Sequence, residues 1–154
     1  MAISAVASSA GRCDANATSA RPPVARVTNG PVNIAFLGVL VPQKGVPQLL
    51  EALGGMRERN DWTATLAGYG DINAWRAEAA RLGIAERVNF PGWLDATGVD
   101  ELLASSQIYV LPSFSEGLPM SILEAFSAGI PVVATPLNAI TDVVVPERNG
   151  LLVP

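Results

Sequence analysis

A doubly wound α/β fold with a mostly parallel sheet is the architecture that the sequence predicts, and three observations support this prediction. From residue 31 onward, short apolar runs alternate with amphipathic stretches of helical length. The connections between them are short and contain glycine, proline or helix-capping side chains. Hydrophobic residues make up 49% of the 154 residues and charged residues 16%, which favours a compact domain over a disordered chain. Strands and helices that alternate in this way are typical of a Rossmann-like sheet.

The first 30 residues differ from the rest of the chain. They are rich in alanine and serine, show no sustained periodicity, and end in the turn-like segment Thr28-Asn29-Gly30-Pro31. We therefore expect a flexible tail or linker at residues 1–30 and a single Rossmann-like domain at residues 31–154.

Each expected strand is an apolar run that is closed by a glycine, a proline or another turn residue. In chain order these runs are residues 32–38, 62–67, 88–90, 108–111, 130–135 and 150–153. Continuous apolar runs of this kind indicate strands of a parallel sheet, because helices cover both faces of such a sheet.

Each expected helix carries apolar residues that recur along one face. In chain order the helices are residues 47–57, 72–82, about 97–105, a helix that starts at Pro119 and ends before Gly129, and residues 138–144. Gly83 is expected as the C-cap of the second helix, and Asp95 or Thr97 as the N-cap of the third.

The loop and helix after the fourth strand carry the strongest functional signal. Glu116 lies in the loop, and Gly117 allows backbone conformations that a side chain forbids. Pro119 suits the first position of a helix, and Glu124 lies on a polar stripe of that helix. The other side of the helix is apolar, with Leu118, Ile122, Leu123 and Phe126.

Glu116 and Glu124 are thus placed around the start of one helix. A helix that follows a strand in an open α/β sheet presents amide donors and a positive dipole end to an anion. The two carboxylates could flank one ligand, such as a polyhydroxylated molecule that carries a phosphate. The alternative is a loop acid and an unrelated acid on a solvated face, and this stretch alone does not decide between the two.

Loops after other strands are expected at the same edge of the sheet. Lys44 follows the first strand, where an ammonium group could reach a phosphate. Gly68-Tyr69-Gly70-Asp71 follows the second strand and is similar to half of a phosphate-binding glycine loop. Each feature has a simpler explanation, a solvated lysine and a pair of turn glycines. Trp93 could stack on a base or cover the sheet edge, and we favour the second.

The composition excludes several classes of function. The net charge is −4 and no basic stripe with interleaved aromatic residues occurs, so we expect no nucleic-acid partner. The chain has no histidine and only one cysteine, Cys13, which excludes a Ser-His-Asp triad, a disulfide framework and a zinc site made by this chain alone. Because no apolar run is long enough to span a membrane, we expect a cytoplasmic protein with at most peripheral membrane association.

Taken together, the segments resemble the C-terminal, donor-binding domain of retaining GT-B glycosyltransferases of the group 1 (family 4) type. The resemblance runs from about Val32 to Pro154, and the matching segments occur in the family's order. They are Phe36-Leu37-Gly38, Pro42-Gln43-Lys44-Gly45, Ala67-Gly68-Tyr69-Gly70, Val88-Asn89-Phe90-Pro91-Gly92, Leu111 to Pro119, Glu124-Ala125, Gly129 to Ala134, and Asn149 to Val153.

The resemblance implies a nucleotide-diphosphate sugar as donor, retaining transfer of a hexosyl group to an acceptor, and a place in glycan biosynthesis. It implies no cofactor and no required metal, since positive side chains and helix amides would neutralise the diphosphate. Glu116 and Glu124 match the acids of the family's Glu-x7-Glu motif. By position, Glu116 would be the catalytic residue and would hydrogen-bond the sugar hydroxyls, while Glu124 would bind the ribose hydroxyls.

The remaining site residues that the resemblance implies surround these two acids. Gly117, Leu118 and Pro119 would bring the helix start to the phosphates, and Lys44 would meet the diphosphate. Gly68 belongs to the matching glycine segment. The segment that contains Phe90 and Pro91 would lie beside the base.

The sequence departs from the family's pattern at two places. The family often has an arginine directly after the first strand's glycine, where Val39 stands here, so one positive charge is lost. The family's Gly-Gly-x-Pro-Glu segment corresponds to Asn138-Ala139-Ile140-Thr141-Asp142, which shortens the acid.

The resemblance covers one half of a GT-B architecture, without the N-terminal acceptor domain and the final C-terminal helix. We therefore expect the isolated chain to be inactive, because the acceptor must be held against the anomeric carbon. A binding module without catalysis remains an alternative. A sugar-nucleotide epimerase is disfavoured, because its chemistry would need further acids and a histidine.

Overall fold

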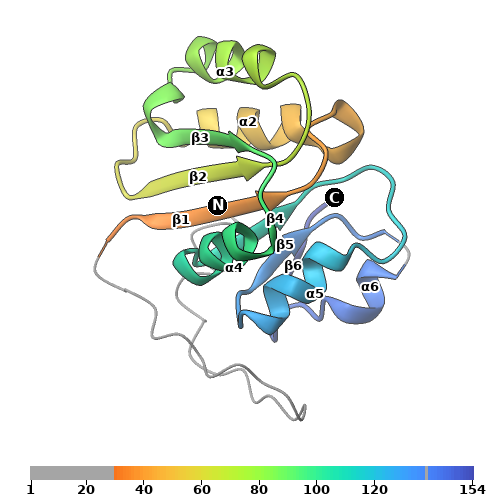
Figure 1. Ribbon diagram of the computed structural model, residues 1–154. Helices are drawn as coiled ribbons and strands as arrows, with labels where there is room; N and C mark the ends of the chain where they lie inside the picture. The colour runs from red at the N-terminus through yellow and green to blue at the C-terminus, as the bar shows by residue number, and fades with distance from the viewer. Residues whose placement is uncertain (1–29, 138) are drawn as a thin grey trace.

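The computed structural model describes residues 30–137 and 139–154 (Figure 1). Within these residues the chain forms a six-stranded sheet with the order β3-β2-β1-β4-β5-β6, in which every neighbouring pair is parallel. The strands are β1 (Val32–Leu37), β2 (Trp62–Ala67), β3 (Val88–Gly92), β4 (Ile108–Leu111), β5 (Val132–Ala134) and β6 (Gly150–Leu152). The tail predicted at residues 1–30 lies outside the described residues, apart from Gly30.

The strand order shows that the sheet is doubly wound. The chain runs outward from β1 through β2 to β3, crosses back to β4, and then runs outward in the other direction to β6. Right-handed crossovers place α2 and α3 on one face of the sheet and α4, α5 and α6 on the other (Figure 1). The predicted fold class is confirmed. The strand order reverses between β1 and β4, and ligands of open α/β sheets bind beyond the carboxyl ends of the strands at such a point.

The five predicted helices are all present. They are α2 (Val46–Gly54), α3 (Ile72–Arg81), α4 (Ala96–Ser105), α5 (Met120–Ser127) and α6 (Ile140–Val143), with 3₁₀ turns η1 (Pro42–Lys44) and η2 (Ala85–Arg87). The Asp71 carboxylate caps α3 by accepting a hydrogen bond from the Ala74 amide at 3.1 Å. Asp95, and not Thr97, caps α4 through the Gly98 amide at 2.8 Å. These caps satisfy amides that have no partner within the helix.

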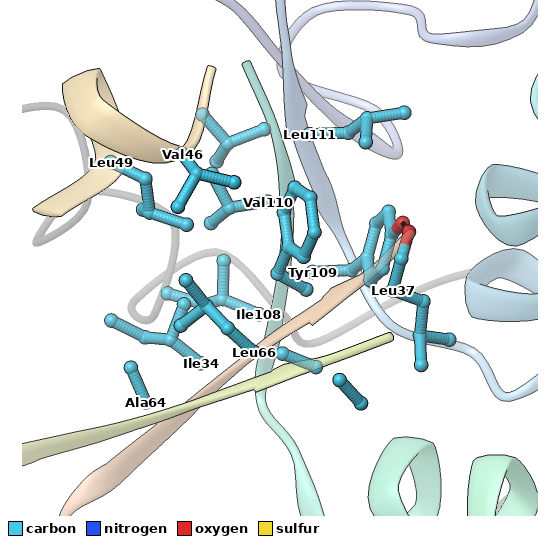
Figure 2. Packing of buried hydrophobic residues seen from close by; sticks show 14 of the residues in the cluster. Ile34, Leu37, Val46, Leu49, Ala64, Leu66, Ile108, Tyr109, Val110 and Leu111 are labelled. Atoms are coloured by element: carbon cyan, nitrogen blue, oxygen red, sulfur yellow. Dashed lines mark hydrogen bonds between the residues drawn. The ribbon is translucent and has the colours of Figure 1, made fainter. Parts of the chain in front are cut away.

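The core lies on both faces of the central strands, and β4 shows how it is divided. Val46 and Leu49 of α2 lie on the side of β4 that carries Val110, whereas Tyr109 points away from them toward Leu37 (Figure 2). All four residues of β4 are buried. A strand with two covered faces is what the continuous apolar run at residues 108–111 predicts.

Most element boundaries shift slightly from the sequence prediction, and two of these shifts concern predicted site residues. β3 extends to Gly92, so that Pro91 lies inside a strand; β3 is an edge strand, where a missing amide donor is tolerated. Helix α5 begins at Met120, and Pro119 is its N-cap residue with extended backbone angles (φ −72°, ψ 125°). Pro119 thus precedes the helix, one residue earlier than its predicted position.

Candidate functional site

A pocket opens at the carboxyl edge of the sheet, at the reversal point between β1 and β4. Its volume is about 360 Å³, and it is lined by Leu37, Gly38, Val39, Lys44, Leu111, Glu116, Pro119 and Ser121. These residues come from the ends of β1 and β4, the loops that follow them, and the start of α5. The pocket therefore lies where the topology predicts a ligand site.

An ion pair between Lys44 and Glu116 lies at the centre of this pocket. Lys44 Nζ is 2.6 Å from Glu116 Oε1, and the side chains are 28% and 9% exposed. The Ser113 hydroxyl donates a second hydrogen bond to Glu116 Oε1 at 2.8 Å. Ser113 is itself buried, and its carbonyl oxygen accepts a hydrogen bond from the Thr135 hydroxyl. The Glu116 carboxylate is thus oriented before any ligand binds.

Tight backbone contacts bring the Lys44 loop against the Glu116 loop. Gly45 has a φ of 73°, and a Cβ at this position would lie 1.9 Å from the Pro112 carbonyl oxygen. The Phe114 amide donates to the Gln43 carbonyl at 2.9 Å. Only glycine allows both this backbone conformation and this approach. The sequence signal for the contact is the glycine directly after Lys44.

Helix α5 directs its start toward the pocket. Pro119 and Ser121 line the pocket from the N-cap and the second helical position. The first amides of a helix have no intrahelical partner, and the dipole places positive potential at this end. The pocket thus combines an ammonium group, a carboxylate and a helix start, which matches a ligand with both anionic and hydroxyl groups.

Tyr109 lies beneath the pocket, and sequence reasoning assigned it only to a strand. Its side chain is fully buried, and its hydroxyl donates to the Leu37 carbonyl at 3.1 Å (Figure 2). Burial raises the pKa of Tyr109 well above its usual range, and the charges of Glu124 and Glu116 raise it further. The sequence feature that distinguishes Tyr109 is a single hydroxyl in the otherwise apolar strand at residues 108–111.

Glu124 lies on α5 with its side chain exposed, outside the residues that line the pocket. Glu116, in contrast, is among the residues that line the pocket. The prediction that they flank one ligand stays a prediction.

Gly117 and Leu118 lie in the exposed part of the loop. Gly117 does not adopt the backbone region that favours glycine, and a Cβ there would meet no atom within 4 Å. The prediction that its backbone forbids a side chain is therefore wrong. Leu118 is exposed and precedes α5, so it does not belong to the apolar face of the helix as predicted.

The predicted residues Gly68, Phe90 and Pro91 lie on the β2–β3 side of the sheet, outside the pocket lining. A Cβ at Gly68 would lie 1.8 Å from the Gly38 carbonyl, so Gly68 allows the β1 and β2 ends to approach closely. Phe90 is only 2% exposed and belongs to the core. Its side chain cannot meet a base, and its backbone carbonyl accepts a hydrogen bond from Arg76 at 3.1 Å. Pro91 is exposed in the edge strand.

The described part of the chain contains neither a candidate metal site nor a candidate membrane-spanning helix. Across residues 30–137 and 139–154, no group of three or more His, Cys, Asp or Glu side chains could hold a metal ion. In the same residues, no helix has the length and apolarity to cross a membrane.

Comparison with known proteins shows which family this chain is similar to. Residues 31–154 match the family described as "Glycosyl transferases group 1". The chain belongs to this family. It is 35% identical over 124 residues to a phosphatidyl-myo-inositol mannosyltransferase of Mycobacterium leprae, covering 79% of this chain and 33% of that protein. The chain thus spans about a third of the length of the curated relatives it matches.

Solved structures share the fold of this chain. The apo form of the lipopolysaccharide outer core galactosyltransferase WaaB aligns with a TM-score of 0.74 at 32% identity, over 86% of this chain and 38% of that one. Anabaena Alr3699/HepE in complex with UDP-glucose aligns with a TM-score of 0.72 at 27% identity, over 82% and 35% of the two chains. The domain described here is therefore the C-terminal, Rossmann-like domain of a GT-B glycosyltransferase.

Proposed function

We propose that this domain binds a nucleotide-diphosphate sugar and holds it for retaining transfer of the hexosyl group to an acceptor. The observation that carries the proposal is the pocket in which Lys44, Glu116 and the start of α5 meet. A diphosphate needs a cation and amide donors, and sugar hydroxyls need fixed acceptors. The complexes of Alr3699/HepE with UDP and UDP-glucose support this assignment by similarity.

The Lys44 and Glu116 side chains of the pocket neutralise each other. Lys44 is bonded to Glu116, so a bound diphosphate competes with Glu116 for the ammonium group. When Lys44 turns to the phosphates, Glu116 becomes an acceptor for sugar hydroxyls and stays oriented by Ser113. Donor binding on this account exchanges one ion pair for another.

The remaining roles follow the positions of the residues. Glu124 binds the ribose hydroxyls, and Gly117, Leu118 and Pro119 lead the backbone to the phosphates. Gly68 and Pro91 border the donor on the β2–β3 side, and Phe90 contributes only its backbone there. Lys44 and the α5 amides take over the neutralisation of the diphosphate, so we propose that donor binding requires no metal.

One observation favours binding without catalysis as a second candidate. Val39 lines the pocket and is 47% exposed, at the place where related enzymes often have an arginine. Lys44 is the only cation among the residues that line this pocket. A weakened hold on the diphosphate would suit a module that binds a nucleotide sugar without transferring it.

Isothermal titration with UDP-, GDP- and ADP-glucose in the presence of a chelator tests the proposal. We expect at least one of the three to bind. Lys44→Met should weaken binding roughly 10- to 100-fold, since a charge-assisted hydrogen bond contributes roughly 1.5–3 kcal/mol. Arg57→Met, which removes an exposed cation from the region after α2, is the matched control and should have no effect. Binding by none of the three sugars would overturn the proposal.

Glu116→Gln separates the sugar contact from the diphosphate contact. The variant should bind UDP at least as tightly as the unmodified chain, because the neutral amide no longer competes for the Lys44 charge. It should lose the additional affinity for UDP-glucose over UDP, because the amide is a poorer acceptor for sugar hydroxyls. Equal losses for UDP and UDP-glucose would instead show that Glu116 only holds the loop together.

A further inference from the structure

We propose that Thr135 is a positioning residue for the sugar contact of Glu116, and that it acts through Ser113. This inference rests on the proposed function and adds to it the residues that keep Glu116 in place once Lys44 has turned to the phosphates. Two hydrogen bonds in series carry it. The Thr135 hydroxyl donates to the Ser113 carbonyl, and the Ser113 hydroxyl donates to Glu116 Oε1 at 2.8 Å.

The parallel pairing of β4 with β5 places Thr135 beside the loop that carries Glu116. Ala134, the last residue of β5, pairs with Leu111, the last residue of β4. Thr135 therefore lies one residue beyond the paired strand ends, and its amide donates to the Leu111 carbonyl at 3.4 Å. A carbonyl can only accept, so the Thr135 hydroxyl is the donor in its bond to Ser113.

The peptide unit between Ser113 and Phe114 is held at both of its polar groups. Its carbonyl accepts from Thr135 at the end of β5. Its amide, which belongs to Phe114, donates at 2.9 Å to the carbonyl of Gln43 in the 3₁₀ turn after β1. Because Ser113 is fully buried, losing either partner would leave a backbone group without compensation. The loops after β1 and β5 thus fix the residue whose hydroxyl bonds Glu116.

The outer part of the same loop is open, in contrast to its first residues. Gly117 and Leu118 are exposed, and a Cβ at Gly117 would meet no atom within 4 Å. Glu116 precedes them, yet its side chain is only 9% exposed, and Lys44 and Ser113 both bond its Oε1 atom. When a diphosphate draws Lys44 away, Ser113 keeps its bond. The direction in which the carboxylate meets the sugar therefore depends on where Ser113 is held.

The experiment measures the sugar gain, the factor by which UDP-glucose binds more tightly than UDP in titration calorimetry. Thr135→Val removes the hydroxyl but keeps the shape of the side chain. It should reduce the sugar gain about fivefold, the size of one hydrogen bond, without weakening UDP binding. Thr135→Ser retains the hydroxyl and should retain the sugar gain.

Two further variants test the route of the effect. Ser113→Ala removes the second bond of the series but no partner of a backbone group, and it should reduce the sugar gain by a similar factor. In a Glu116→Gln background, where the sugar gain is already lost, Thr135→Val should change it no further, because Thr135 acts through Glu116.

A matched threonine controls for loss of stability. The Thr63 hydroxyl donates to Asn33 Oδ1 at 2.7 Å, and Thr63 is the second residue of β2, at the opposite, amino edge of the sheet. Thr63→Val should lower the thermal stability as Thr135→Val does, yet leave the sugar gain unchanged.

The outcomes separate this inference from the proposed function. An unchanged sugar gain in Thr135→Val, an equal loss in Thr135→Ser or Thr63→Val, or a further loss in the Glu116→Gln background would overturn the inference alone. If the unmodified chain shows no sugar gain, or if Glu116→Gln keeps it, the sugar contact proposed for Glu116 fails and this inference fails with it.

Discussion

At the scale of single residues, the pocket is defined by a small number of charges. Lys44 and Glu116 neutralise each other, and Val39 adds apolar surface to the wall. The affinity of this pocket for an anion is therefore limited by the number of its cations. A cation introduced at the position of Val39 tests this limit directly.

Val39→Arg should tighten the binding of UDP about tenfold, because a guanidinium can form charge-assisted bonds with the diphosphate. Val145→Arg is the matched control, since Val145 is also an exposed valine but lies outside the pocket lining. Titration calorimetry at low and high salt measures both. Equal tightening by the two variants would show that net charge, and not the pocket, determines the affinity.

A second prediction at this scale concerns Gly117, whose backbone conformation does not require glycine. Gly117→Ala should leave the free energy of unfolding unchanged or raise it by about 0.4–1 kcal/mol through the unfolded state. It should nevertheless weaken UDP binding, since the new methyl group occupies space that is open in the free protein. Urea unfolding and titration measure the two effects. Unchanged affinity would remove Gly117 from the site.

Other residue roles depended on where side chains point, which a sequence does not show. Phe90 was assigned to the base, yet strand alternation at β3 directs it into the core. Tyr109 was treated as one more apolar strand residue, because nothing in residues 108–111 shows that its hydroxyl reaches Leu37. Glu116 and Lys44 were found because loop residues after parallel strands share one edge.

At the scale of elements, the apolar runs and turn residues were sufficient to predict every strand and every α-helix of the described residues, with shifts at their ends, whereas the two 3₁₀ turns were not predicted. The start of α5 was placed one residue early, because Pro119 suits an N-terminal position on either side of the boundary. Leu118 was then counted on the helix face, although it lies before the helix. The N-cap of α4 was predicted only as two alternatives, since Asp95 and Thr97 both fit the pattern and the choice depends on local geometry.

The cap of α3 gives a prediction about stability alone. Asp71→Ala should lower the free energy of unfolding by about 1 kcal/mol, because the Ala74 amide loses its acceptor. UDP affinity should not change, since Asp71 does not line the pocket. Asp61→Ala, which removes a partner of Arg59 at the surface, should cost less. An Asp71 variant that loses affinity at unchanged stability would place the β2–α3 loop in the donor site.

At the scale of the whole molecule, the carboxyl edge of the sheet is both polar at its centre and apolar around it. Most of the exposed large hydrophobic residues among those described follow strands at this edge: Val39, Tyr69, Trp93, Phe114, Leu118 and Met120. Tyr69 and Trp93 stack on each other with ring centroids 6.2 Å apart. Such a rim is suited to a facing domain that closes over the donor.

A donor site alone is not sufficient for transfer of a sugar on physical grounds. The acceptor must be held against the anomeric carbon, and a second domain across the edge would supply it. We propose that the chain binds a nucleotide sugar but transfers none without that domain. The doubly wound topology was predictable from the alternation of elements, whereas the facing surface was implied only by family resemblance.

The most direct test of the central claim is a map of amide chemical shifts during titration of the chain with UDP-glucose. We expect the largest changes at Gly38, Lys44, Glu116 and Ser121, and none at Arg59 and Asp61, an ion pair outside the pocket. Saturable shifts confined to the pocket would support a donor site at the reversal point of the sheet. Shifts centred elsewhere, or no saturable shifts, would contradict it.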